Sequence, residues 1–311
     1  MKIVSYALML LFFLSCCSQK ERTEVHESCR GAVVAHPAFS SDSAYSYIQE
    51  QCGFGPRTPN AESHDQCAAY LKDKLERFGC QTIIQTFSAQ AYDGTMLNGT
   101  NIIGRSRPEI DKRVALFAHW DTRPFSDNDQ KHNWHKPVMG ANDGASGVAV
   151  LLEVARQMQI RNDSIGVDIV FLDLEDYGQP SFEMKETEDS WCLGAQYLSH
   201  NFYSGVKPQK GILLDMVGAK NPCFAYDHVS VFFAEQLLQE VWSVAKSLGY
   251  SSSFVVRESG GIIDDHYYIN KNARIPTVDV IDFDAGRGFP DTWHTQNDTP
   301  ENIDKASLQM V

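Results

Sequence analysis

The sequence predicts one α/β domain: a single domain with a mixed, mainly parallel central β-sheet and helices on both faces. Short apolar runs rich in β-branched residues occur at 114–118, 167–172, 211–214 and 277–281. Between these runs, residues 146–158 and 231–248 repeat apolar side chains at the spacing of one helix face. Buried strands that alternate with helices are typical of βαβ units, whose strands are parallel.

The chain before residue 113 predicts a first helix and an antiparallel edge of the sheet. Ser63 and Gln66 have the spacing of a capping box, and apolar residues keep helical spacing from there to Gly79. Two β-like runs, 82–87 and 101–104, follow. Their hairpin-like arrangement predicts that they form the antiparallel part of the sheet.

The N-terminus has the pattern of an export signal. Lys2 is followed by the apolar run 3–14, which is shorter than the roughly 20 residues that a membrane-spanning helix needs. The run ends at Ser15 and Cys16. A small residue before a cysteine is similar to a bacterial lipoprotein signal, which predicts lipid attachment at Cys16. Plain secretion and a retained membrane helix are the alternatives.

This pattern divides the chain into three segments: a signal peptide at 1–16, a polar tether at 17–40 and the α/β domain at 41–311. We expect the domain on the periplasmic side of a bacterial cell envelope, anchored to a membrane through the lipid. Cysteines of an exported protein can pair, but buried free thiols are the simpler expectation. No Cys-x-x-Cys spacing occurs, so a thiolate zinc site is not expected.

The composition is that of a globular and acidic protein. Hydrophobic residues make up 43% and charged residues 22% of the chain, which excludes a disordered chain or a coiled coil. Asp and Glu number 40 against 27 Lys and Arg, so the net charge is −13. Nucleic-acid-binding proteins carry a basic surface, so we expect no nucleic-acid partner. We expect a monomer.

Acidic and histidine residues follow the apolar runs where each predicted strand ends. Ligands of open α/β sheets bind outside the carboxyl ends of the strands. A single acid at a strand end is better explained as a turn or helix-cap residue. The rim should collect His119, Asp121, Asp143, Glu175, Asp176, Asp215 and His294. Since so many like charges repel one another without a cation, and since carboxylates and imidazoles suit zinc, the sequence predicts a zinc site.

Six segments at this rim resemble the zinc aminopeptidase (M28-like) family and, within it, the glutaminyl-peptide cyclotransferases. The resemblance runs from about residue 45 to the end of the chain. The segments are Ala118–Asp121, Gly140–Gly147, Phe171–Asp176, Leu214–Ala219, Asp264–His266 and Trp293–Thr295.

The resemblance implies a role for each matched residue and makes 41–311 a catalytic domain. Asp143, Asp176 and His294 resemble the ligands of a single zinc ion. Glu175 resembles the catalytic acid and base. Asp215 and Asp264 resemble an acidic pair beside Glu175, and Trp293 resembles a tryptophan of the pocket wall. The supporting or second-metal candidates are His119, Asp121 and His266, and a helix cap is the alternative for His266. A core aromatic is the alternative for Trp293.

The long loop 122–139 offers one further substrate-binding candidate. Loops of more than about 12 residues are usually functional or disordered. Trp134 in this loop is a candidate for the pocket entrance, with surface packing as its alternative.

The implied activity is the conversion of the N-terminal glutamine of peptides or proteins to pyroglutamate, with release of ammonia. The tryptophan before the last histidine, the extra acid Asp264 and the run 216–222 favour this cyclase. The alternative is an aminopeptidase with two zinc ions. It would use five ligands, with Asp143 bridging the metals: His119, Asp143, Asp176, Asp215 and His294.

The disulfide of animal cyclases cannot form here, because Ala118 stands at the position implied for one of its cysteines. Cys52 and Cys67 are the one candidate pair in this chain.

Overall fold

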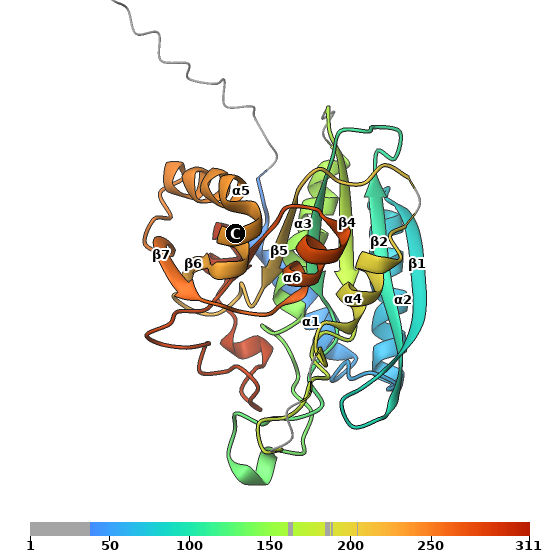
Figure 1. Cartoon of the computed structure of the whole chain (residues 1–311), viewed down its shortest axis with the longest axis vertical. Coiled ribbons are helices and arrows are strands. Elements are labelled where there is room, and N and C mark those ends of the chain that lie inside the picture. The colour runs from blue at the N-terminus through green and yellow to red at the C-terminus, as the bar shows by residue number, and fades with distance from the viewer. Residues whose placement is uncertain (1–37, 161–163, 184–186, 188, 204) are drawn as a thin grey trace, which may run out of the picture. The chain divides into compact units, whose positions relative to one another are not determined.

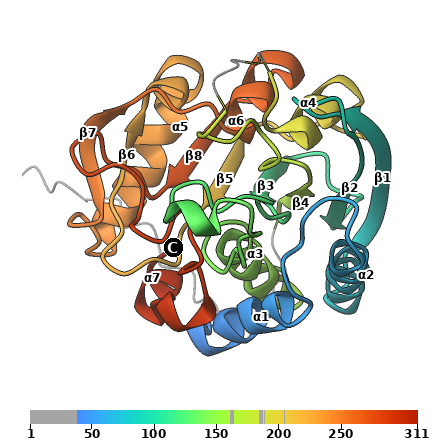
Figure 2. The same ribbon diagram turned by 90° about the horizontal axis from the view of Figure 1, so that it is seen from below.

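A six-stranded mixed sheet forms the centre of the domain (Figure 1), in the order β1-β2-β4-β3-β5-β8 (Figure 2). Its strands are β1 (Gln81–Gln90), β2 (Met96–Ser106), β3 (Arg113–His119), β4 (Gly166–Leu172), β5 (Gly211–Asp215) and β8 (Thr277–Ile281). The four strands from β4 to β8 pair in parallel, whereas β1 and β2 pair antiparallel with their neighbours. This confirms the predicted mixed, mainly parallel sheet with an antiparallel edge.

The computed structural model describes residues 38–160, 164–183, 187, 189–203 and 205–311. These residues belong to one compact unit, Pro37–Val311. The predicted signal peptide, its lipidated Cys16 and nearly all of the tether lie outside the described residues and stay predictions. In the part of the chain that is described, no helix has the length and apolarity to cross a membrane.

Helices cover both faces of the sheet, as predicted (Figure 2). The helices are α1 (Ser41–Gly53), α2 (Glu62–Arg77), α3 (Ala145–Met158), α4 (Leu193–His200), α5 (His228–Ser247), α6 (Asp265–Tyr268) and α7 (Lys305–Met310). Short 3-10 turns lie at Lys131–Asn133 and Pro300–Asn302, and a π-turn at Ile269–Ala273. A second, two-stranded parallel sheet pairs β6 (Phe224–Asp227) with β7 (Phe254–Gly260).

Two apolar clusters fill the space between the layers. The larger joins α1, α2, α3 and α5 to one face of the sheet, through residues such as Leu71, Leu151 and Val280. The smaller joins α4 and α6 to the other face, through residues such as Phe117 and Leu198. Because both faces are covered, the central strands are buried on both sides and read as nearly continuous apolar runs.

The predicted capping box is wrong, although the helix itself is present. Helix α2 begins at Glu62, after Ala61, which makes no side-chain cap. The Ser63 hydroxyl instead donates to the Pro56 carbonyl at 2.5 Å. The Ser63 hydroxyl therefore bonds to a carbonyl outside the helix, and not to a backbone N–H group of the first helical turn as a capping box requires.

The candidate disulfide is also wrong. Cys52 and Cys67 are both free cysteines. Burial raises the pKa of Cys67 to about 12, so this thiol is neutral and packs as a small apolar side chain.

Candidate active site

The ends of the parallel strands bring the predicted rim residues together. His119 ends β3, Asp215 ends β5, and Glu175 and Asp176 follow β4 within four residues. Asp143 comes from the loop that opens α3. All parallel strands end at the same edge of a sheet, so their following residues converge there.

Asp143, Asp176 and His294 form a compact, buried cluster of metal-ligand atoms. Their donor atoms lie within 4.8 Å of one another. His294 Nε2 lies 3.4 Å from Asp176 Oδ1 and 3.7 Å from Asp143 Oδ2. Burial raises the pKa of Asp176, and the nearby Asp143 carboxylate raises it further. Two carboxylates and one imidazole that leave room for a further ligand are a donor set that fits catalytic zinc.

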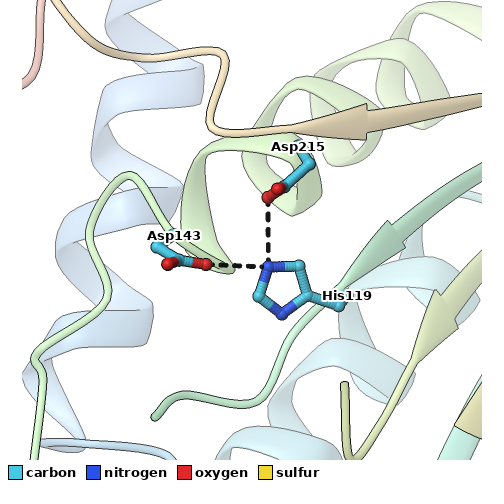
Figure 3. Close-up of side chains that lie close together, drawn as sticks. All are labelled: His119, Asp143 and Asp215. Atoms are coloured by element: carbon cyan, nitrogen blue, oxygen red, sulfur yellow. Dashed lines mark hydrogen bonds and ion pairs between the residues drawn. The ribbon is translucent and has the colours of Figure 1, made fainter. Parts of the chain in front are cut away.

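A second cluster shares Asp143 with the first (Figure 3). His119 Nε2 lies 3.1 Å from both Asp143 Oδ1 and Asp215 Oδ1. Burial disfavours a charged imidazole, but hydrogen bonds to Asp121, Asp143 and Asp215 outweigh it and raise the pKa of His119 well above its usual value. The cluster therefore suits a positive charge, carried either by the imidazolium or by a second metal ion.

Two further carboxylates fix the loops that carry the ligands. Asp121 accepts hydrogen bonds from the backbone N–H groups of Glu175 and Asp176, at 3.1 and 3.2 Å. Asp298 accepts from the backbone N–H groups of Asn142 and Asp143, at 2.7 and 3.0 Å. Asp121 was predicted as a site residue, and the structure gives it this orienting position.

Glu175 lies at the wall of the cavity, half-buried. Burial raises the pKa of its carboxyl group well above the usual value, and the carboxylates of Asp176, Asp264 and Asp265 raise it further. Among the described residues its side chain accepts one hydrogen bond, from Cys192 Sγ to Oε1 at 3.3 Å. An acid of raised pKa that borders a cavity is suited to take up and release a proton.

Asp215 and Asp264 border the same cavity as Glu175. Burial raises the pKa of Asp215 to about 7, with further contributions from Asp143 and Asp264. Burial likewise raises the pKa of Asp264. With its pKa raised, each of the two carboxyl groups holds a proton more readily than an exposed aspartate does.

His266 lies apart from both metal clusters. Its Nε2 is 3.0 Å from Asp227 Oδ1, and its Nδ1 is 3.6 Å from Asp279 Oδ2. With Asp264 and Asp279 it forms a third buried group, which reaches the cavity through Asp264. The structure does not bring His266 to the predicted zinc ligands.

The cavity at the rim has a volume of about 570 Å³. The acidic part of its lining consists of Asp143, Glu175, Asp176, Asp189, Asp215 and Asp264, with His294 beside them. Its apolar wall is made by Trp191, Ile262, Ile263, Phe283, Phe289 and Trp293. The Trp293 ring stacks on Phe289 with 4.3 Å between ring centres. No Lys or Arg is among the described residues that line the cavity.

Trp134 does not reach this cavity in the structure. Its ring stacks on Phe182 with 5.2 Å between ring centres, and its Nε1 donates to the Asp129 carbonyl at 2.9 Å. The two tryptophans of the prediction thus differ, because Trp293 lines the cavity and Trp134 packs within the loops beside it.

Several residues that hold the site together were missed from the sequence. Buried Arg57 donates to the carbonyls of Trp120, Met139 and Gly140, and so fixes the loop before Asp143. Asp298 lies in a loop without periodicity, and no local pattern distinguishes it. Arg123 stands two residues after Asp121, and its place just beyond a strand end was an available signal.

An α/β sheet with two carboxylate–histidine clusters at the carboxyl ends of its strands defines the class of metal-dependent exopeptidase-like enzymes. The sequence profile of Peptidase family M28 matches residues 101–311, and the chain therefore belongs to this family.

Within this family, its relatives include glutaminyl cyclases. The chain is 49% identical to Bacteroides thetaiotaomicron glutaminyl cyclase bound to N-acetylhistamine, with a TM-score of 0.87 and coverage of 89% of this chain and 96% of that one. It is 23% identical to Bos taurus glutaminyl-peptide cyclotransferase, over 82% of this chain and 75% of the relative. A leucine aminopeptidase precursor from Bacteroides thetaiotaomicron is also similar, with 49% identity, a TM-score of 0.86 and coverage of 90% and 96%.

Proposed function

We propose that this chain is a zinc-dependent glutaminyl-peptide cyclotransferase. It converts the N-terminal glutamine of peptides and proteins to pyroglutamate and releases ammonia. The observation that carries this function is the position of Glu175. Its carboxyl group borders one cavity together with the candidate zinc ligands, the Asp215–Asp264 pair and the Trp293 wall. The 49% identity to a solved glutaminyl cyclase supports the same function.

The cavity accounts for the binding of a glutamine side chain. Trp293 and Phe289 offer an apolar wall against which its two methylene groups can pack. Asp143, Asp176 and His294 would hold one zinc ion, which supplies Lewis-acid polarisation of the side-chain carbonyl. Asp215 and Asp264 would hydrogen-bond the polar groups of the substrate.

Glu175 would move the proton of the reaction. The α-amine of the substrate attacks its own side-chain carbonyl carbon, so one C–N bond forms and the bond to the side-chain nitrogen breaks. Glu175 takes a proton from the attacking amine and returns it to the departing ammonia. Nucleophile and electrophile belong to the same residue, so no water has to be activated and one zinc ion is sufficient.

An assay with a peptide that begins with glutamine tests this function. We expect release of ammonia and a product that is about 17 Da lighter, as acyl transfer to an internal amine requires. We also expect one zinc ion per chain. Release of free amino acids from the peptide, without a lighter product, would contradict the cyclase.

A two-zinc aminopeptidase is the second candidate. The His119–Asp143–Asp215 cluster favours it, because Asp143 is shared between the two clusters and could bridge two ions. Two zinc ions per chain and release of N-terminal residues from peptides without glutamine would support it. The same assay therefore separates the two activities.

We propose that the chain carries a lipid anchor at Cys16 and is located on the periplasmic side of the bacterial cell envelope. The short apolar run after Lys2 and the following Ser15 and Cys16 support this proposal. Cys16→Ser should abolish labelling by a fatty acid and release the protein from membranes. Unchanged membrane association of this variant would contradict the anchor. A monomeric state is proposed as well, and light scattering tests it.

A further inference from the structure

A buried arginine–carboxylate pair lies directly behind the candidate zinc ligands. Arg123 and Asp127 belong to the loop that follows β3, and their side chains are only 1% and 4% exposed. Arg123 Nε donates to Asp127 Oδ1 at 2.7 Å, and Nη2 donates to Oδ2 at 2.8 Å. These two parallel hydrogen bonds fix the guanidinium and the carboxylate in one plane.

Each member of the pair contacts a different candidate ligand. Arg123 Nη1 donates to the backbone carbonyl of Asp176 at 3.1 Å and to its Oδ1 at 3.3 Å. Asp127 Oδ1 lies 3.2 Å from Nδ1 of His294. The other ring nitrogen of His294, Nε2, faces Asp143 and Asp176. A carboxylate on one imidazole nitrogen fixes the tautomer and the ring orientation for a metal on the other.

Asp127 is itself held in place by the loop after β4. The backbone N–H of Ser181 donates to Asp127 Oδ2 at 2.7 Å, and the Ser181 hydroxyl donates to the Asp127 carbonyl at 2.9 Å. Both carboxylate oxygens therefore have partners in the protein. Such a group cannot rotate away from His294 without breaking several hydrogen bonds at once.

Arg123 also contacts the wall of the substrate cavity. Its guanidinium carbon lies 4.6 Å from the ring centre of Trp191, which lines the cavity. The Trp191 ring is nearly parallel to that of His294, with 6.3 Å between ring centres. One cation thus contacts a candidate ligand and the substrate wall together.

A second buried pair shows what a purely structural role would look like. Arg113, at the other end of β3, donates to Asp168, and both side chains are fully buried. The partners of Asp168 are Arg105, Arg113 and Tyr203, none of which is a candidate ligand. Buried ion pairs alone are weak evidence for stability, so contacts to the ligands are what set Arg123 and Asp127 apart.

We propose that Arg123 and Asp127 form a positioning unit that sets the zinc affinity of this chain, with Asp127 orienting His294 and Arg123 orienting Asp176. The inference rests on the proposed zinc site. It assigns both residues an effect on metal binding, separate from any contact with the peptide.

Zinc affinity, measured by competition with a chromogenic chelator, tests the unit in the full-length chain. We expect Asp127→Ala to weaken zinc binding about 10- to 100-fold, the usual loss for such an outer partner, with a smaller loss for Asp127→Asn. Arg123→Lys keeps the positive charge but cannot form the two parallel hydrogen bonds to Asp127, so this variant should bind zinc more weakly as well. Asp168→Asn is the matched control and should leave zinc affinity within about 2-fold of the unaltered chain.

Circular dichroism at saturating zinc shows which variants are folded. If Asp127→Ala does not fold, Asp127→Asn and Arg123→Lys carry the test. The positioning role would be overturned if these variants bound zinc as tightly as the unaltered chain. It would also be overturned if Asp168→Asn lost as much zinc affinity as they do. In either case the unaltered chain would still bind zinc and form pyroglutamate, so the proposed function would stand. An unaltered chain that binds no zinc would overturn both.

Discussion

At the scale of single residues, the half-buried carboxyl group of Glu175 is the centre of the proposed chemistry. It lies directly before the candidate ligand Asp176, and both backbone N–H groups are held by Asp121. In the proposed function the two neighbouring side chains have different tasks, with Glu175 as acid and base and Asp176 as a zinc ligand. This division leads to predictions that separate turnover from metal binding.

Glu175→Gln should remove turnover and keep zinc. Glutamine has the shape of glutamic acid but cannot carry the proton, so we expect kcat to fall by about 10²- to 10⁴-fold. Zinc content should remain at one ion per chain in elemental analysis. Loss of the metal from this variant would mean that Glu175 is itself a ligand.

Cys192 forms two hydrogen bonds to Glu175. Its backbone N–H donates to the Glu175 carbonyl at 2.9 Å, and its thiol donates to the Glu175 carboxylate. We expect Cys192→Ala to lower kcat by about 10-fold, because the Glu175 carboxyl group loses the hydrogen bond that orients it. KM should change little, because the residues of the cavity wall remain. Cys80 is buried and is not among the residues that line the cavity, so Cys80→Ala is the control. Equal kinetic effects in the two variants would refute a specific role for Cys192.

At the scale of elements, close backbone packing decides where the ligand loops lie. Gly147, in the first turn of α3, lies against β5: a Cβ atom there would be 2.2 Å from the Leu214 carbonyl oxygen. The helix that begins just after Asp143 is therefore seated directly on the strand that ends in Asp215. Only a glycine permits this approach.

Gly147→Ala should push α3 away from β5 and disturb the shared ligand Asp143. We expect a loss of about 3 kcal/mol in the free energy of unfolding, as for an overpacked core, and weaker zinc binding. Denaturant unfolding measures the first quantity. Gly53→Ala in α1 is the control, because its Cβ would meet nothing within 4 Å. A stability of Gly147→Ala equal to that of the control would show that the packing is not limiting.

A buried histidine connects α2 to the end of β4. His64 Nε2 lies 2.8 Å from Asp173 Oδ1, and its ring stacks on Trp120. Burial disfavours the imidazolium, but the charge and hydrogen bond of Asp173 outweigh it, so the pKa of His64 is raised. A raised pKa stabilises the fold below the unfolded pKa of about 6.5, and this contribution is lost as the pH rises through the folded value.

His64→Gln should therefore cost more stability at pH 5.5 than at pH 9. The difference reflects about 1.4 kcal/mol for each unit by which folding raises the pKa. Urea unfolding of both proteins at the two pH values measures it. A cost that is independent of pH, or larger at pH 9, would contradict a charged His64.

At the scale of the whole molecule, charge is concentrated at one rim. Many acids lie at the site or support it: Asp121, Asp127, Asp143, Asp173, Glu175, Asp176, Asp189, Asp215, Asp264, Asp265 and Asp298. Repulsion among them opposes folding unless a cation is bound. The net charge of −13 is thus in part a property of the site.

Zinc should stabilise the whole fold. A ligand that binds only the folded state adds about 2.7 kcal/mol at a free concentration 100 times its dissociation constant. We expect Tm to rise with added zinc and to fall after chelation, as measured by calorimetry. A Tm that is insensitive to both would contradict a zinc site at this rim.

The sequence by itself determined the fold class and the members of the rim. Apolar runs and helical spacing depend on local burial, so the strands β3, β4, β5 and β8 and the helix α3 could be predicted from them. Because parallel strands end at one edge, the residues that follow them could also be assigned to one site. Asp143, Asp176 and His294 are among these rim residues, and the family resemblance is what singles them out as candidate zinc ligands.

Only the tertiary structure decided which side chains touch. His266 pairs with Asp227 and Asp279 instead of approaching the metal cluster. Trp134 packs on Phe182, outside the cavity lining. Arg123, Asp127 and Asp298 act across loops whose course follows no periodic pattern. The sequence places Arg123 just beyond a strand end, but its contacts depend on packing between residues far apart in the chain. That packing follows no local pattern.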